Sequence, residues 1–164
     1  MSETVRNILV RKSTVVNAPL AFLFEFFTRR QNEWWPRNHH IGGKEPFTAI
    51  MEPRAGGRWY ERADDGSECG WGKVLVWEPP VRVVFTWDIG ADWKYDPSLG
   101  TEVELTFAAE GPECTRVRLE HRKLERYADK AETMRAMFDS EDAWPATLSA
   151  FAKAAESARA ERAV

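Results

Sequence analysis

The stretch TRVRLEH, from Thr115 to His121, indicates the fold most clearly. Apolar and charged side chains alternate along it, with Val117, Leu119 and His121 in one set and Arg116, Arg118 and Glu120 in the other. Because successive side chains of a β-strand point to opposite faces of its sheet, this stretch is predicted to be a strand with one buried and one solvated face.

The same alternation recurs upstream. Val103, Leu105 and Phe107 oppose Glu102, Glu104 and Thr106, and Val83, Phe85 and Trp87 oppose Arg82, Thr86 and Asp88. Strands are predicted over residues 6–16, 47–52, 57–62, 68–77, 81–89, 101–109 and 115–121, separated by short segments rich in Pro, Gly and Asp. Half-buried strands joined by short turns predict an antiparallel sheet that is covered on one side.

The cover is predicted to be a C-terminal helix. Its apolar positions follow a four-three-four-three spacing, at Trp144, Leu148, Phe151, Ala155 and Ala158. Asp142 is a suitable N-cap for this helix, since it places Pro145 in the first turn, where a missing N–H has no intrahelical partner to lose.

Two shorter helices are predicted as well. Residues 20–28 follow Pro19 and carry phenylalanines at helical spacing, and residues 130–138 carry Met134 and Met137 as a flap over one end of the sheet. Between the first helix and the second strand, residues 31–43 are predicted to form a helical turn and an irregular loop.

Composition favours one α+β domain over residues 1–164. The 23 basic and 26 acidic residues are interspersed, which argues against nucleic acid as the main partner. The sequence shows neither a signal peptide nor an apolar run of membrane-spanning length, so we expect a cytoplasmic protein without membrane insertion. Cys69 and Cys114 are expected to remain thiols. Eight tryptophans are the compositional anomaly.

Several segments together resemble one protein family. They are PRAGGRWY from Pro53, DGSECGWGKV from Asp65, EPPVRVVFTW from Glu78, TEVELTF from Thr101, TRVRLEH from Thr115 and the helix from Trp144 to Phe151. In these segments the chain resembles bacterial members of the family named after the activator of Hsp90 ATPase, within the START-like (SRPBCC) superfamily.

The resemblance implies a helix-grip fold, in which a curved antiparallel sheet of about seven strands wraps around a long C-terminal helix. It further implies a deep cavity, used across the superfamily for lipids and hydrophobic metabolites. The eukaryotic namesake carries a separate N-terminal domain for chaperone binding that has no counterpart here, so the resemblance does not imply a co-chaperone role.

Inward-facing aromatic residues are the candidates for a cavity lining, since ligand sites are mostly apolar. The predicted ligand-binding residues are Trp35, Phe47, Trp59, Trp71, Phe85, Trp87, Phe107, His121, Met134, Met137, Trp144 and Leu148. The alternative for each aromatic residue is a place in a solid core. For His121 the alternatives are orienting a ligand and bonding to a backbone carbonyl. Lys73 is either a buried charge or a side chain that reaches solvent.

No cofactor or metal site is predicted. His39 and His40 are adjacent and lack a third ligand at a suitable spacing, and neither a nucleophile motif nor a phosphate-binding loop occurs.

Three functions follow from these observations. The first is non-catalytic binding of a small hydrophobic molecule in an apolar cavity. The second is a START-like enzyme acting on a hydrophobic substrate. The third is a protein-interaction module, or a homodimer, that uses an exposed patch of Trp34, Trp93 and Tyr95.

Overall fold

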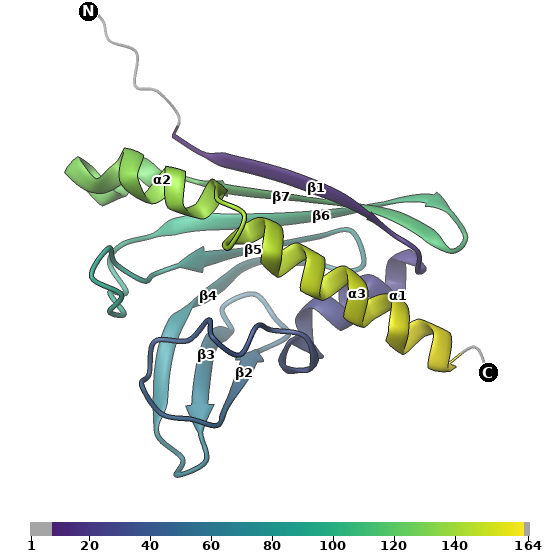
Figure 1. The fold of residues 1–164 in the computed structure, drawn as a ribbon, viewed down its shortest axis with the longest axis horizontal. Helices are drawn as coiled ribbons and strands as arrows, with labels where there is room; N and C mark the ends of the chain where they lie inside the picture. The colour runs from purple at the N-terminus through teal and green to yellow at the C-terminus, as the bar shows by residue number, and fades with distance from the viewer. Residues whose placement is uncertain (1–7, 163–164) are drawn as a thin grey trace, which may run out of the picture.

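The computed structural model describes residues 8–162, so the expected start of the first strand at Arg6 lies outside the described residues. Seven strands form one antiparallel sheet in the order β1-β7-β6-β5-β4-β3-β2. Their bounds are β1 Val10–Val16, β2 Phe47–Met51, β3 Arg58–Ala63, β4 Glu68–Glu78, β5 Arg82–Trp87, β6 Thr101–Gly111 and β7 Cys114–Arg122. The sheet curls around a long helix, as Figure 1 shows. The predicted helix-grip fold is confirmed.

The strand register explains the alternation of side chains. In the β6–β7 pair, Val103 lies opposite His121, Leu105 opposite Leu119, and Phe107 opposite Val117. All six of these side chains are buried. The charged residues between them form ion pairs on the outer face, where Glu104 contacts Arg82 and Arg122. One sheet face is therefore apolar and the other charged.

Three helices and two short 3-10 segments complete the fold within residues 8–162. They are α1 Leu20–Thr28, η1 Gln31–Glu33, η2 Leu124–Lys130, α2 Ala131–Asp139 and α3 Trp144–Arg162. Helix α3 crosses the concave face of the sheet, with α1 beside its C-terminal half and α2 leading into its N-terminus (Figure 1). None of the helices within residues 8–162 is long and apolar enough to span a membrane.

The predicted N-cap of α3 is wrong by one residue. The backbone N–H of Thr147 donates to the carbonyl of Ala143 at 3.0 Å, which is the first hydrogen bond of the helix. Ala143, immediately before Trp144, therefore occupies the cap position. Asp142 lies one residue before this cap, and among the described residues its side chain makes no hydrogen bond to the backbone of the first turn.

Strand β4 departs from regular alternation at a bulge. Trp59 pairs with Gly72 and Tyr60 pairs with Gly70, so Trp71 is an additional residue between them. Trp71 is buried, whereas Lys73 is exposed. The bulge therefore turns Lys73 to solvent, as the second alternative for this residue anticipated.

Candidate functional site

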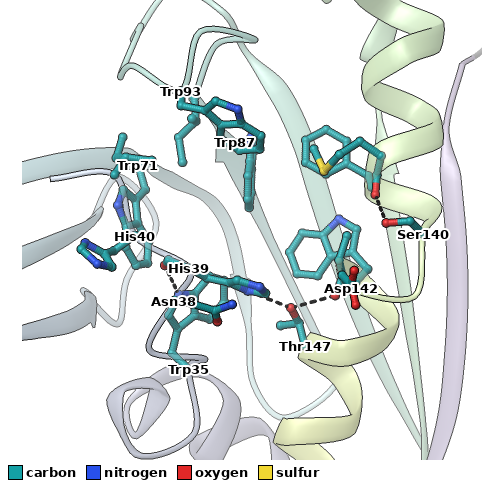
Figure 2. Close-up of a pocket in the computed structure, with 16 residues that line it drawn as sticks. Trp35, Asn38, His39, His40, Trp71, Trp87, Trp93, Ser140, Asp142 and Thr147 are labelled. Atoms are coloured by element: carbon teal, nitrogen blue, oxygen red, sulfur yellow. Dashed lines mark hydrogen bonds between the residues drawn. The ribbon is translucent and has the colours of Figure 1, made fainter. Parts of the chain in front are cut away.

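A cavity of about 440 Å³ lies between the N-terminal end of α3 and the sheet (Figure 2). Its apolar lining consists of Trp35, Ile41, Trp71, Trp87, Ile89, Trp93, Met137, Phe138, Ala143 and Trp144. Its polar lining consists of Asn38, His39, His40, Ser140, Asp142 and Thr147. The cavity falls within the roughly 300–1,000 Å³ range of small-molecule sites.

Five indoles make most of the apolar wall. Trp35 and Trp71 pack with ring centroids 5.3 Å apart, and Trp87 meets Trp144 edge to face at 5.6 Å. Trp93 contributes the fifth indole from the loop between β5 and β6, and about half of its surface is exposed. The indoles thus come from five separate segments of the chain: the loop after η1, strand β4, strand β5, the loop between β5 and β6, and the first residue of α3.

A buried carboxylate fixes one wall of the cavity. Oε1 of Glu61 on β3 accepts hydrogen bonds from the indole N–H of Trp71 at 2.7 Å and from the backbone N–H groups of Ile41 and Gly42 at 2.9 and 3.1 Å. The other oxygen, Oε2, lies 3.5 Å from Nδ1 of His40. Glu61 therefore ties the loop after η1 to the sheet and sets the position of Trp71.

His121 fixes the opposite wall. The Trp144 indole N–H donates to Nδ1 of His121 at 3.1 Å, so the neutral imidazole carries its proton on Nε2 and donates to Oγ1 of Thr101 at 3.0 Å. The Thr101 hydroxyl in turn donates to the carbonyl of Trp87 at 2.7 Å. Complete burial lowers the pKa of His121 to about 3. A neutral relay thus connects the indole of Trp144 to the backbone of Trp87.

The polar groups of the cavity gather near the start of α3. Nδ1 of His39 lies 3.4 Å from Oγ1 of Thr147, whose hydroxyl donates to the carbonyl of Ala143 at 3.1 Å (Figure 2). Burial lowers the pKa of His39, and a bond to the backbone of Asp142 partly opposes this effect. His39 is therefore neutral at pH 7 and able to accept a proton.

Residues 17–156 match the family model described as "Activator of Hsp90 ATPase homolog 1-like protein". The chain belongs to this family. A comparison with curated proteins gave no match.

Solved structures show the same fold. The anthrahydroquino-gamma-pyrone synthase Txn09, complexed with SUM, is 39% identical over 89% of this chain and 96% of its own, with a TM-score of 0.62. The self-sacrificing resistance protein CalC from Micromonospora echinospora is 29% identical over 92% and 95% of the two chains, with a TM-score of 0.68. Protein NE0264 from Nitrosomonas europaea has a TM-score of 0.64 at 12% identity over 92% and 96%, and shares the fold alone.

In this family member, the predicted ligand-binding residues separate into two groups. Five line the cavity: Trp35, Trp71, Trp87, Met137 and Trp144. Seven are buried outside the lining: Phe47, Trp59, Phe85, Phe107, His121, Met134 and Leu148. The alternation of side chains predicts which face of the sheet a residue lies on, but not whether it lines the cavity or packs in the solid core. Residues such as Phe85 and Phe107 lie where the phenylalanines of α1 fill the concave face, with Phe27 contacting both rings.

His121 fits neither of its two predicted roles. It lies outside the cavity lining, and both ring nitrogens bond to side chains, those of Trp144 and Thr101, instead of to a backbone carbonyl.

The predicted exposed patch of three aromatic residues does not form. Trp34 is buried against Phe27 and Phe151, and its indole N–H donates to the carbonyl of Phe26 at 3.0 Å. Trp93 and Tyr95 remain exposed on one loop. The surface that motivated the interaction-module hypothesis is therefore reduced from three aromatic residues to Trp93 and Tyr95.

Sequence reasoning missed most of the polar lining. Asn38, Ser140 and Asp142 occupy connections without periodicity, where no pattern indicates side-chain direction. For His39, the sequence suggests only a metal-binding role, through its neighbour His40. Among the described residues no cluster of three or more metal-ligating side chains occurs.

Proposed function

We propose that this protein binds a flat, largely apolar molecule of fused aromatic rings in the cavity between α3 and the sheet. The observation that carries the proposal is the convergence of five indoles around about 440 Å³. Planar rings stack on or abut indoles with about 0.5–1.5 kcal/mol per pair beyond the burial of area. A cavity with indoles on several sides therefore favours aromatic ligands over aliphatic ones of equal size.

The comparisons support this ligand class. The relative at 39% identity is named as a synthase of an anthrahydroquino-gamma-pyrone, a fused aromatic skeleton, and the match covers nearly all of both chains. The polar groups near the start of α3 fit a ligand whose hydroxyl or keto groups lie along one edge, with Thr147 and His39 as hydrogen-bond partners.

Binding of quinizarin, a dihydroxyanthraquinone, tests the proposal by isothermal titration calorimetry. The cavity-filling variant Ala143→Phe should bind at least about tenfold more weakly, because it places a ring in the lining. The matched control Ser149→Phe changes an exposed position of the same helix and should bind as the wild type does. Absence of binding by the wild type, or equal binding by Ala143→Phe, would refute the proposal.

A second candidate function is ring closure on such a ligand, with His39 as general base. It is favoured by the neutral imidazole in the lining and by the synthase among the relatives. In the reaction, His39 takes the proton of a phenol while the phenol oxygen forms a C–O bond to a side-chain carbonyl carbon, and the protonated His39 returns this proton to the carbonyl oxygen. The hydroxyl formed in this way then leaves as water together with a proton from the adjacent carbon, and the resulting double bond completes a pyrone ring.

An ortho-hydroxyphenyl β-diketone tests this chemistry, since its closure to a chromone is followed by ultraviolet absorbance. His39→Gln should lower the rate about 100-fold while quinizarin still binds. A rate in the wild type equal to the uncatalysed rate would exclude the second function and leave the first intact.

A further inference from the structure

The charges around the cavity bear on the charge of its ligand. None of the 16 described residues that line it is Lys or Arg. His39 is neutral at pH 7 because burial lowers its pKa. Asp142, by contrast, is an exposed carboxylate in the lining, beside Thr147 in Figure 2. Within residues 8–162 its carboxylate makes neither a hydrogen bond nor an ion pair.

Further carboxylates lie behind the lining. Glu61 is buried beneath Trp71 and His40, and Glu45 lies 2.9 Å from Nε2 of His40 on its solvent side. His40 thus has a carboxylate at each ring nitrogen, with Glu61 3.5 Å from Nδ1. Arg37 lies behind the same wall, where its Nε donates to the carbonyl of Trp35 at 3.1 Å and offsets part of this negative charge, so Asp142 is the carboxylate that faces the cavity itself.

The indoles of the lining also favour a positively charged ligand. The positive N–H edges of Trp35, Trp71 and Trp144 donate to the protein itself, at His39 O, Glu61 Oε1 and His121 Nδ1. The electron-rich ring surfaces are therefore the parts of these residues left for a ligand, and such surfaces attract cations by about 0.5–2 kcal/mol each.

The N-terminus of α3 favours a negatively charged ligand, but its partial positive charge is smaller than the negative charge of Asp142. A helix N-terminus carries roughly half a positive charge, and Pro145 removes one of the N–H groups that would express it. The full charge of Asp142, next to the same helix end, exceeds that half charge.

From these observations we propose that the cavity selects a fused-ring ligand that carries a basic amine, with the ammonium group near Asp142 and the rings among the indoles. This inference rests on the proposed binding function and adds the charge of the ligand to it. Neutral ring systems are expected to bind more weakly, and anionic ones most weakly.

Three acridines of equal ring size test the charge preference by calorimetry at pH 7. They are 9-aminoacridine, a cation, acridine, which is neutral, and acridine-9-carboxylate, an anion. The cation should bind about tenfold more tightly than the neutral ring and the anion more weakly than both. Asp142→Asn should reduce the cation's advantage about threefold and leave the affinity for neutral acridine unchanged.

Controls separate the possible failures. Ala143→Phe should weaken binding of all three probes, which places them in the cavity, and Ser149→Phe should not. Equal affinities for cation and anion, or an equal effect of Asp142→Asn on all three probes, would overturn the charge preference alone. Absence of binding by all three acridines, with quinizarin still bound, would overturn this inference alone, whereas absence of quinizarin binding as well would refute the binding function.

Discussion

Protonation of His121 should couple stability to pH, and the structure gives the magnitude. His121 is completely buried, and its two nitrogens bond to Trp144 and Thr101. Burial alone lowers its pKa to about 3 from 6.5. In the folded protein the imidazole stays neutral down to that pH, whereas in the unfolded chain it gains a proton below pH 6.5. Stability linked to this group is therefore complete above pH 6.5 and falls as the pH decreases toward 3.

The expected loss between pH 7 and pH 5 is about 2 kcal/mol, since each unit below the unfolded pKa contributes about 1.36 kcal/mol. The variant His121→Asn keeps an acceptor for the Trp144 N–H but does not titrate. At pH 7 it should be less stable by about 2–3 kcal/mol, because the bond to Thr101 is lost and space opens beside Phe138, whose ring centroid lies 4.4 Å away.

Urea unfolding of both proteins at pH 7 and pH 5, followed by near-ultraviolet circular dichroism, measures this coupling. The advantage of the wild type should shrink by about 2 kcal/mol at pH 5. His39 is present in both proteins, so its own titration cancels from the difference. Parallel pH dependence in the two proteins would refute the assignment of His121 as a buried neutral group.

Two further predictions concern residues that shape the cavity wall. A Cβ at Gly72 would lie 1.9 Å from the carbonyl oxygen of Thr86, so Gly72→Ala should destabilise the protein by about 3 kcal/mol in urea unfolding. Gly111→Ala is the control: the nearest atom to its Cβ would be 3.7 Å away, and stability should change by less than about 0.5 kcal/mol. Glu61→Gln keeps an acceptor oxygen and should lower the free energy of unfolding by about 1 kcal/mol. Glu61→Ala leaves three N–H donors unpaired, so it should lower the free energy of unfolding by about 3 kcal/mol and weaken quinizarin binding. Unchanged quinizarin binding by Glu61→Ala would show that Glu61 does not position the cavity wall.

The sequence predicted the architecture because the sheet is half-buried. In such a sheet, alternation in stretches such as Thr101–Phe107 directly reports which face is covered, and the stripe from Trp144 to Ala155 identifies the covering helix. The prediction failed where the chain breaks the period of two. At the bulge, Trp71 and Lys73 share a parity but not a face, and only the strand register reveals it.

The polar part of the site was beyond such reasoning for a different reason. His39 and Asp142 are more than 100 residues apart in sequence, and no local pattern links them. They meet because Glu61 ties the loop after η1 to β3, and because α3 begins at Trp144 and leaves Asp142 outside its first turn. The first cause is a tertiary contact, and the second is a helix start one residue later than the sequence indicates.

The existence of the cavity follows from how unevenly the concave face is filled. Under the middle of α3, Phe27 and Phe151 pack with ring centroids 5.3 Å apart, and Phe24 meets Phe107 at 5.5 Å, so the aromatic rings there close a solid core. Helix α1 supplies that filling and reaches only one end of the sheet (Figure 1). At the other end the large side chains are indoles, and Trp35, Trp71 and Trp144 are held in place by bonds from their N–H groups to His39, Glu61 and His121. Indoles anchored in this way do not move inward to fill the cavity. Aromatic side chains therefore complete the core at the α1 end of the sheet and line an open cavity at the other end.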